Sequence, residues 1–190
     1  MRPLVYEGGA ASVAFFAAFI LYSTAETVLQ RRTRTEARDP SRIWMIVASL
    51  GGIAIAFLVA GNPHLPGHDW LPVAVGLALM AIGAALRYWS VLTLGRFFTV
   101  TVVEVGADHE LVDRGPYALL RHPSYTGMLI VYLGVGVALD SWLGAAAAVL
   151  VPVPAVVYRI THEERLLREQ LGASYVSYEG RTKRLVPGLW

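Results

Sequence analysis

The chain has 190 residues, of which 55% are hydrophobic and only 16% carry a charge, and this composition excludes an ordinary soluble domain. It contains no cysteine, which excludes disulfides, zinc ribbons and cysteine nucleophiles. The net charge of +2 is too small to indicate a nucleic-acid partner.

The apolar residues are gathered in long blocks that predict five transmembrane helices. A bilayer core requires about 20 apolar residues per helix. The blocks are residues 10–29, 43–60, 71–86, 128–139 and 142–160. The helix begun by the third block extends to about residue 94. No small-residue cleavage site follows the first block, so we interpret it as a retained helix.

Basic and non-basic connections alternate along the chain. Five arginines lie in residues 31–42, three lie in 95–125, and five basic residues follow residue 161, whereas 61–70 and 140–141 contain neither lysine nor arginine. The positive-inside rule then places the N-terminus outside and the C-terminus in the cytosol, a parity that five spans satisfy. We therefore expect a multi-pass protein of a bacterial inner membrane, with its polar clusters on the cytosolic side.

The last two spans are separated by only two polar residues, 140–141, so we expect them to form a tight antiparallel hairpin. Three glycines should permit close packing in this hairpin: Gly134, Gly136 and Gly144. Pro152 and Pro154 should kink the final span.

Two polar clusters, residues 108–127 and 158–166, flank this hairpin in the sequence. Because the two cytosolic ends of a hairpin lie side by side, we expect the clusters to meet. We expect an all-α integral membrane fold, a bundle of five transmembrane helices in a single membrane domain over residues 1–190. Three N-terminal spans would occupy 1–94, and the functional core would occupy 95–190.

Several motifs recur at fixed spacing in this core. They are Leu-Val-x-x-Gly-Pro-Tyr at 111–117, Arg-His-Pro-x-Tyr-x-Gly at 121–127, two glutamates at 163–164, and Leu-Gly-x-x-Tyr-x-x-Tyr at 171–178. The series resembles the isoprenylcysteine carboxyl methyltransferase family and, more loosely, phospholipid N-methyltransferases and related bacterial membrane methyltransferases. The resemblance implies an S-adenosylmethionine site at the cytosolic face, formed by the last hairpin, the segment before it and the C-terminal tail. It also implies a lipophilic acceptor that enters from the bilayer.

The resemblance further implies roles for individual residues. The positions that would bind the cofactor are His109, Glu110, Leu111, Val112, Tyr117, Leu119, Leu120, Arg121, His122 and Glu163. The positions that would act in catalysis are Arg159, which would orient the acceptor, with Glu163 and Glu164. Val102 stands where eukaryotic members carry a cofactor-contacting glutamine, which is a departure from the family pattern.

The chemistry of these side chains agrees with such a site. S-Adenosylmethionine carries an ammonium that suits a carboxylate such as Glu163 and a carboxylate that suits a donor such as Arg121 or His122. Tyr117 offers an aromatic face for the adenine or the sulfonium. Methyl transfer needs mainly alignment and exclusion of water. A carboxylate acceptor needs no base, whereas a hydroxyl acceptor needs one, for which the candidates are His122, His162 and Glu164.

Two other functions stay open. The first is N-methylation of phospholipid headgroups, although Arg159 favours an anionic acceptor over an amine. The second is a small membrane scaffold without catalysis, which predicts that the polar clusters tolerate mutation. The main hypothesis is methyl transfer to a carboxylate, as in isoprenylcysteine, or to a hydroxyl oxygen. Its partners would be a lipophilic or prenylated acceptor and membrane lipids, with no nucleic acid.

Other conspicuous residues have structural interpretations. Glu26 lies within the first span, where an ionised group must be paired, and we expect it to reach the arginines that follow that span. Tyr175 and Tyr178 are typical of the aromatic belt at a membrane interface. His64 and His68 have the spacing of a metal pair but lie on the opposite side from both clusters, so we expect no metal site.

Overall fold

The computed structural model describes the whole chain except residues 1–2, 33–39, 63, 66–69, 96–110 and 189. Its helices, in chain order, are η1 (Leu4–Tyr6), α1 (Ala10–Arg32), α2 (Pro40–Leu58), α3 (Leu71–Leu94), η3 (Gly115–Ala118), α4 (Pro123–Ala138), α5 (Trp142–Leu150), α6 (Val153–Leu171) and α7 (Ala173–Arg181). Within these residues there is one isolated bridge, between Leu120 and Lys183, and no strand. The predicted all-α fold is therefore confirmed for the described part of the chain.

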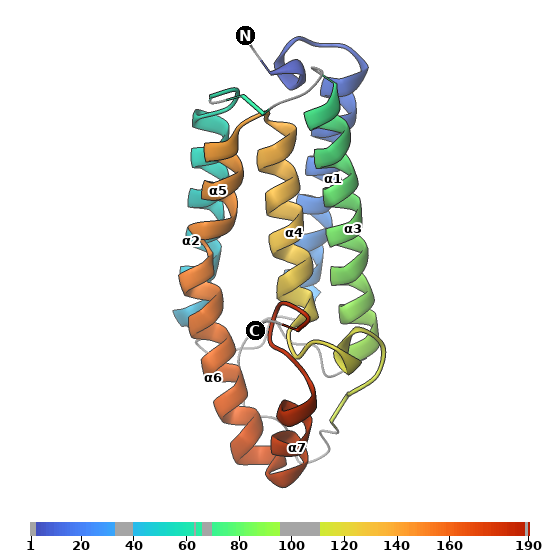
Figure 1. Cartoon of the computed structure of the whole chain (residues 1–190), viewed down its shortest axis with the longest axis vertical. Helices are drawn as coiled ribbons and strands as arrows, with labels where there is room; N and C mark the ends of the chain where they lie inside the picture. Colours follow the sequence, from blue (N-terminus) through green and yellow to red (C-terminus); the bar gives the residue numbers. More distant parts are fainter. Residues whose placement is uncertain (1–2, 33–39, 63, 66–69, 96–110, 189) are drawn as a thin grey trace.

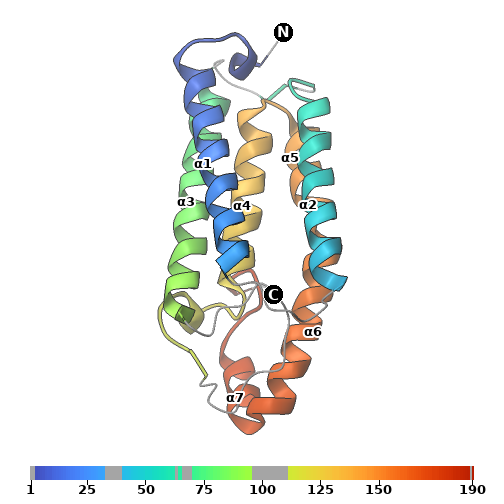
Figure 2. The same cartoon turned by 180° about the vertical axis from the view of Figure 1, so that it is seen from behind.

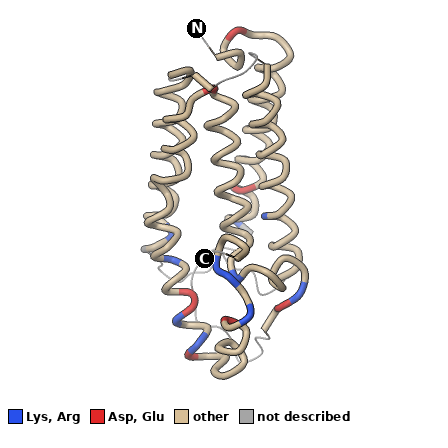
Figure 3. Tube along the Cα trace, in the orientation of Figure 1, with Lys and Arg blue, Asp and Glu red and all other residues tan. Residues whose placement is uncertain are grey.

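The long helices run side by side along the long axis of the molecule (Figures 1 and 2). We call the end where α6 extends past the other helices and meets α7 the polar end, and the end with the α4–α5 turn the hairpin end. Figure 3 shows that charged residues gather at the polar end. The two polar clusters thus share one end of the bundle, as the sequence predicts.

In the part of the chain that the structure describes, four helices are long and apolar enough to cross a membrane: Ala10–Arg31, Ser41–Leu58, Leu71–Leu94 and Trp142–Leu171. The fourth combines α5 and α6. The helix α4 is apolar but has only 16 residues, and at 1.5 Å per residue it is about 24 Å long, less than a hydrocarbon core of about 30 Å. The chain is an integral membrane protein, while its fifth crossing stays a prediction.

The helices α3 and α4 pack closely because glycines from each meet. A Cβ atom on Gly83 would lie 2.6 Å from the carbonyl oxygen of Gly127, and one on Gly76 would lie 2.6 Å from that of Gly134. Small residues that face each other in this way let two backbones approach inside a bilayer. The expectation that Gly134 packs within the α4–α5 hairpin is wrong, because this glycine faces α3.

The predicted hairpin of α4 and α5 is confirmed. A Cβ atom on Gly136 would lie 2.3 Å from Cα of Ala145, so the two helices are in contact beside their turn. Ser141 caps α5 by accepting a hydrogen bond of 3.0 Å from the backbone nitrogen of Gly144. The final span is interrupted between α5 and α6 at Pro152, one of the two prolines where a kink was predicted, whereas Pro154 lies in the first turn of α6.

An ion pair joins α1 to α3 near the polar end. Glu26 accepts hydrogen bonds from Nε and Nη2 of Arg87. Nη1 of Arg87 also donates to Oγ of Ser124 at 2.8 Å, which ties both helices to the first turn of α4. The structural role expected for Glu26 holds, with a partner on α3 instead of one in the loop after α1.

Candidate active site

The segment before α4 is fixed by main-chain hydrogen bonds to the C-terminal tail. The backbone nitrogen of Arg121 donates to the carbonyl of Lys183 at 2.7 Å, and that of His122 donates to the carbonyl of Arg184 at 3.0 Å. The backbone nitrogen of Lys183 donates a hydrogen bond of 3.2 Å to the carbonyl of Leu119. This pairing brings the side chains of Arg121 and His122 to α6, so the two sequence clusters meet.

One half of the site is built around Glu163 of α6. Its Oε1 atom accepts hydrogen bonds from the Tyr125 hydroxyl at 2.5 Å and from Nη2 of Arg159 at 3.2 Å. Nε of Arg159 donates to the same hydroxyl at 2.9 Å, and Nη1 donates to Oγ of Ser41 in α2 at 3.2 Å. The Arg159 side chain is 1% exposed and that of Glu163 is 22% exposed. Glu163 is thus the accessible member of a buried guanidinium–phenol–carboxylate group.

The other half is built around Glu164, whose side chain is fully buried. Its carboxylate accepts hydrogen bonds from Nε of Arg121 at 2.8 Å, from Nη2 of Arg184 at 2.8 Å and from Nη2 of Arg168 at 3.3 Å. Nε2 of His122 lies 3.3 Å from Oε1 of the same carboxylate. A buried charge is tolerated only when it is compensated in this manner. The surrounding cations leave Glu164 poorly suited to accept a proton.

His122 stands between the two glutamates. Its Nδ1 atom lies 3.5 Å from Oε2 of Glu163, and its Nε2 atom lies 3.3 Å from Oε1 of Glu164. Burial acts to lower the pKa of His122, but the two carboxylates outweigh burial and raise this pKa above its ordinary value of 6.5. When it is protonated, the ring can donate from both nitrogens, and it then couples the two halves of the site.

Tyr117 is buried on η3 beside the same cluster. Burial, together with the nearby negative charge of Glu163, raises the pKa of the Tyr117 hydroxyl. Its hydroxyl therefore stays protonated at neutral pH. The carbonyl of Tyr117 accepts a hydrogen bond of 2.7 Å from the Tyr178 hydroxyl, which attaches η3 to α7.

The remaining positions that were expected to bind the cofactor differ in how far they are buried. Leu111 and Val112 are half-buried at the start of a described segment, Leu120 is buried, and Leu119 is exposed. Three expected positions lie outside the described residues: Val102, His109 and Glu110. Their part in the site stays a prediction.

Two side chains that the sequence did not single out belong to this cluster. Tyr125 follows His122 by three residues, so both face the site from the start of α4, and the Arg-His-Pro-x-Tyr motif was the available signal. Arg184 had no such signal, because a basic tail is typical of any cytosolic terminus. Tyr175 and Tyr178 are buried at the polar end, so their interpretation as belt residues is wrong.

The hairpin end holds a separate polar contact. Nδ1 of His64 lies 2.5 Å from Oδ2 of Asp140, and the backbone nitrogen of Leu65 donates to Oδ1 at 2.9 Å. His68 lies outside the described residues. Among the residues that are described, no group of three His, Asp or Glu side chains could hold a metal ion.

Comparisons with known proteins give one consistent result. The phospholipid methyltransferase family matches residues 71–174, more than half of the chain. Protein-S-isoprenylcysteine O-methyltransferase B of Arabidopsis thaliana is 36% identical over 126 residues, which are 66% of this chain and 64% of that protein. A probable protein-S-isoprenylcysteine O-methyltransferase of Oryza sativa subsp. indica is 29% identical over 181 residues, which are 91% of this chain and 94% of that protein.

A solved structure shares the fold. The eukaryotic intramembrane Ras methyltransferase, an isoprenylcysteine carboxyl methyltransferase, superposes with a TM-score of 0.71 and 24% identity over 95% of this chain and 69% of its own chain. The family match runs from α3 to the start of α7 and so includes η3, α4 and α6, which carry Tyr117, Tyr125, Arg159, Glu163 and Glu164, but not Ser41 of α2 or Arg184 of the tail. The chain therefore belongs to the phospholipid methyltransferase family.

Proposed function

We propose that this chain transfers a methyl group from S-adenosylmethionine to an oxygen atom of a lipophilic acceptor in the membrane. The observation that carries the proposal is the group of Arg159, Tyr125 and Glu163, which sets a buried cation beside an accessible carboxylate at the polar end of a membrane bundle. The names of the relatives, isoprenylcysteine O-methyltransferases, support the same class of reaction.

The proposal places the polar end in the cytosol and the N-terminus outside, in a bacterial inner membrane. Support comes from the alternation of basic connections and from the concentration of charge at one end of the bundle (Figure 3). The helix α4 would be the fifth crossing. It would be shorter than its neighbours because its first turn begins inside the site.

The side chains of the site fit S-adenosylmethionine, which supplies an electrophilic methyl group on a sulfonium. Glu163 is a partly exposed carboxylate suited to an ammonium. His122 is a donor suited to a carboxylate, which would take the place of Glu163 at Nδ1, where the present contact is long at 3.5 Å. Arg121 is largely committed to protein oxygens, so we assign it the task of holding this donor in place. The lining of the nucleotide part would come from His109, Glu110, Leu111, Val112, Tyr117, Leu119 and Leu120.

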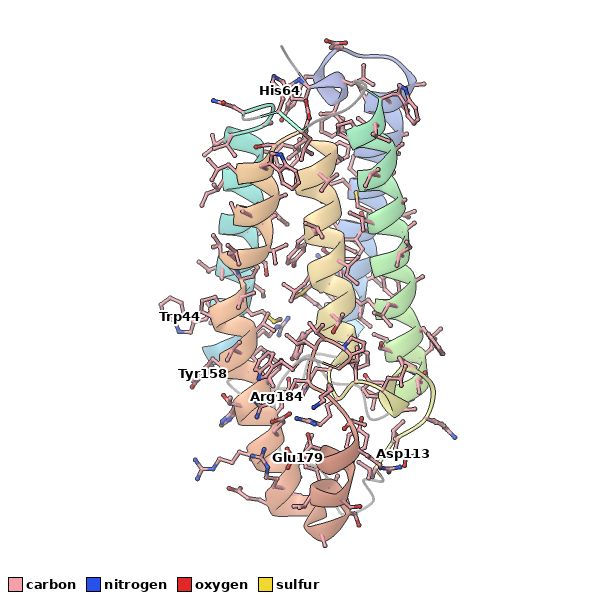
Figure 4. The ribbon with its side chains drawn as sticks, in the orientation of Figure 1. Trp44, His64, Asp113, Tyr158, Glu179 and Arg184 are labelled. Carbon is pink, nitrogen blue, oxygen red and sulfur yellow. The ribbon has the colours of Figure 1, made fainter. Side chains whose placement is uncertain are left out.

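Arg159 would orient the acceptor, with the prenylated cysteine carboxylate as the leading candidate. Its guanidinium is fixed from three sides, by Tyr125, Glu163 and Ser41, so it presents a positive charge in a defined place. A cationic amine headgroup would be repelled by this charge. Tyr158 and Trp44 are exposed on one flank of the bundle, above the polar end, where a lipid-borne acceptor would approach (Figure 4).

The surroundings of the proposed bases favour a carboxylate acceptor over a hydroxyl. Glu164 is engaged by three arginines, His122 carries a proton between two glutamates, and His162 is exposed beside Tyr158. None of these is a free base next to Arg159. A carboxylate acceptor is already ionised, so methyl transfer to it requires only alignment and a dry site. We assign Glu164 a role in holding the charges of the site.

The test is a methyl-transfer assay with purified protein and S-adenosylmethionine labelled in its methyl group. The acceptors are an S-farnesylcysteine with a free carboxylate, its carboxamide, and phosphatidylethanolamine. We expect label in the free acid and none in the other two. Labelled phosphatidylethanolamine would replace this proposal with phospholipid N-methylation. Transfer to none of these acceptors, by protein that binds the cofactor, would refute the assignment of a prenylcysteine.

A further inference from the structure

Arg184 connects the C-terminal tail to the site twice. Its carbonyl accepts a hydrogen bond of 3.0 Å from the backbone nitrogen of His122. Its side chain contacts both oxygens of Glu164, with Nη2 at 2.8 Å from Oε2 and Nε at 3.2 Å from Oε1. The guanidinium also lies over the ring of Trp190, 5.2 Å from its centroid. These contacts hold one cation firmly against a buried carboxylate.

The other two arginines that contact Glu164 also donate hydrogen bonds to other groups. Arg121 donates through Nη1 to the carbonyl of Thr182 at 2.6 Å and reaches the carboxylate through Nε at 2.8 Å. Arg168 is 41% exposed and makes shorter bonds to Glu179 than to Glu164. Arg184 is therefore the cation whose fork is directed mainly at Glu164, and such two-point contacts are the strongest of their kind.

We propose that Arg184 is a positioning residue of the cofactor site: it holds Glu164, and through Glu164 it fixes the ring of His122. This inference rests on the proposed function, which assigns His122 to the carboxylate of the methyl donor. The tail that carries Arg184 is thus part of the site, although its side chain faces Glu164 and not the cofactor.

Loss of the Arg184 charge should change the pH at which His122 titrates, which simple loosening of the tail would not do. His122 faces Glu163 and Glu164 from α6, with Tyr125 stacked beside it. Arg121, Arg168 and Arg184 balance the charge of Glu164 from three different elements. Without Arg184, Glu164 attracts the proton of His122 more strongly, so His122 should titrate at higher pH than in the wild type.

The experiment compares Arg184→Met with the wild type, with Arg184→Lys for rescue and Arg165→Met as a control. Arg165 is a good control because it is 76% exposed on α6 and pairs only with Glu169 among the described contacts. Calorimetry measures the Kd for S-adenosylmethionine, and NMR of labelled histidine follows His122 over roughly pH 5 to 9. The His122 signal is assigned with a His122→Gln variant.

For Arg184→Met we expect about tenfold weaker cofactor binding, the scale of one lost charged hydrogen bond, and a His122 titration displaced to higher pH. Arg184→Lys should return both quantities toward the wild type, and the control should change neither. A folded Arg184→Met protein with the wild-type Kd and titration would overturn the inference.

Failure of the proposed function would look different. A wild type that binds no S-adenosylmethionine removes that function, whereas the His122 titration still decides whether Arg184 positions the ring. If Arg184→Met does not fold, Arg184→Gln keeps a hydrogen-bond donor without the charge. The inference then requires the same displacement of the titration in Arg184→Gln, and an undisplaced titration refutes it.

Discussion

Replacing Glu26 by leucine should destabilise the bundle by about 3–5 kcal/mol, the cost of leaving a buried charge without its partner. The Glu26 and Arg87 side chains are only 13% and 6% exposed. Two donors of Arg87, Nε and Nη2, point at the Glu26 carboxylate. The other bonds of Arg87, from Nη1 to Oγ of Ser124 at 2.8 Å and to its carbonyl at 3.3 Å, are to neutral groups and cannot balance the charge.

The assay is reversible unfolding in mixed detergent micelles, followed by far-ultraviolet circular dichroism. Arg87→Met alone should cost a similar amount, because it leaves the carboxylate of Glu26 unpaired. The double variant should cost less than the sum, since it removes both charges together. A Glu26→Leu cost of less than about 1 kcal/mol, the size of an exposed ion pair, or strict additivity in the double variant would refute this reasoning.

Three further predictions test the site and the packing. Tyr125→Phe removes the hydroxyl shared by Arg159 and Glu163, so it should lower the free energy of unfolding by about 1–3 kcal/mol and slow methyl transfer; equal stability and rate would contradict that role. The pKa of His122 is raised by folding, so its contribution to stability is complete below its ordinary value of 6.5 and is lost as the pH rises through the higher, folded value. Thermal unfolding in the wild type should show this loss, and His122→Gln should not. Gly83→Leu should lower the free energy of unfolding by about 1–3 kcal/mol in the same assay, because the new side chain meets the α4 backbone. Gly51→Ala is the control, because its new methyl group meets open space and should not lower the free energy of unfolding by a comparable amount.

The sequence was sufficient to predict the long apolar helices, the hairpin and the meeting of the two polar clusters, but not α7 or the extension of α6 to Leu171. Long apolar blocks can satisfy their backbone in lipid only as helices, and a two-residue connection at 140–141 allows only a hairpin. The ends of that hairpin then had to bring residues 121–122 and 163–164 to the same end of the bundle. These conclusions depend on composition and chain connectivity, both of which are readable without coordinates.

The partners of individual charges were not predictable. Glu26 pairs with Arg87, 61 residues away, because the rotation of α1 against α3 brings them together, and hydropathy does not report rotation. Glu163 and Glu164 are adjacent in the sequence, yet one is accessible and the other is enclosed by arginines from three elements. The direction in which Gly134 faces depends in the same way on helix rotation.

The central claim is that Glu163 forms part of an S-adenosylmethionine site. Calorimetric titration of the cofactor into detergent-purified wild type and Glu163→Ala, with Arg165→Met as the exposed control on the same helix, tests it most directly. The account predicts binding by the wild type and by the control, and its loss in a Glu163→Ala protein that circular dichroism shows to be folded. Equal binding by all three proteins would remove Glu163 from the site, and a folded wild type that binds no cofactor would contradict the proposed function.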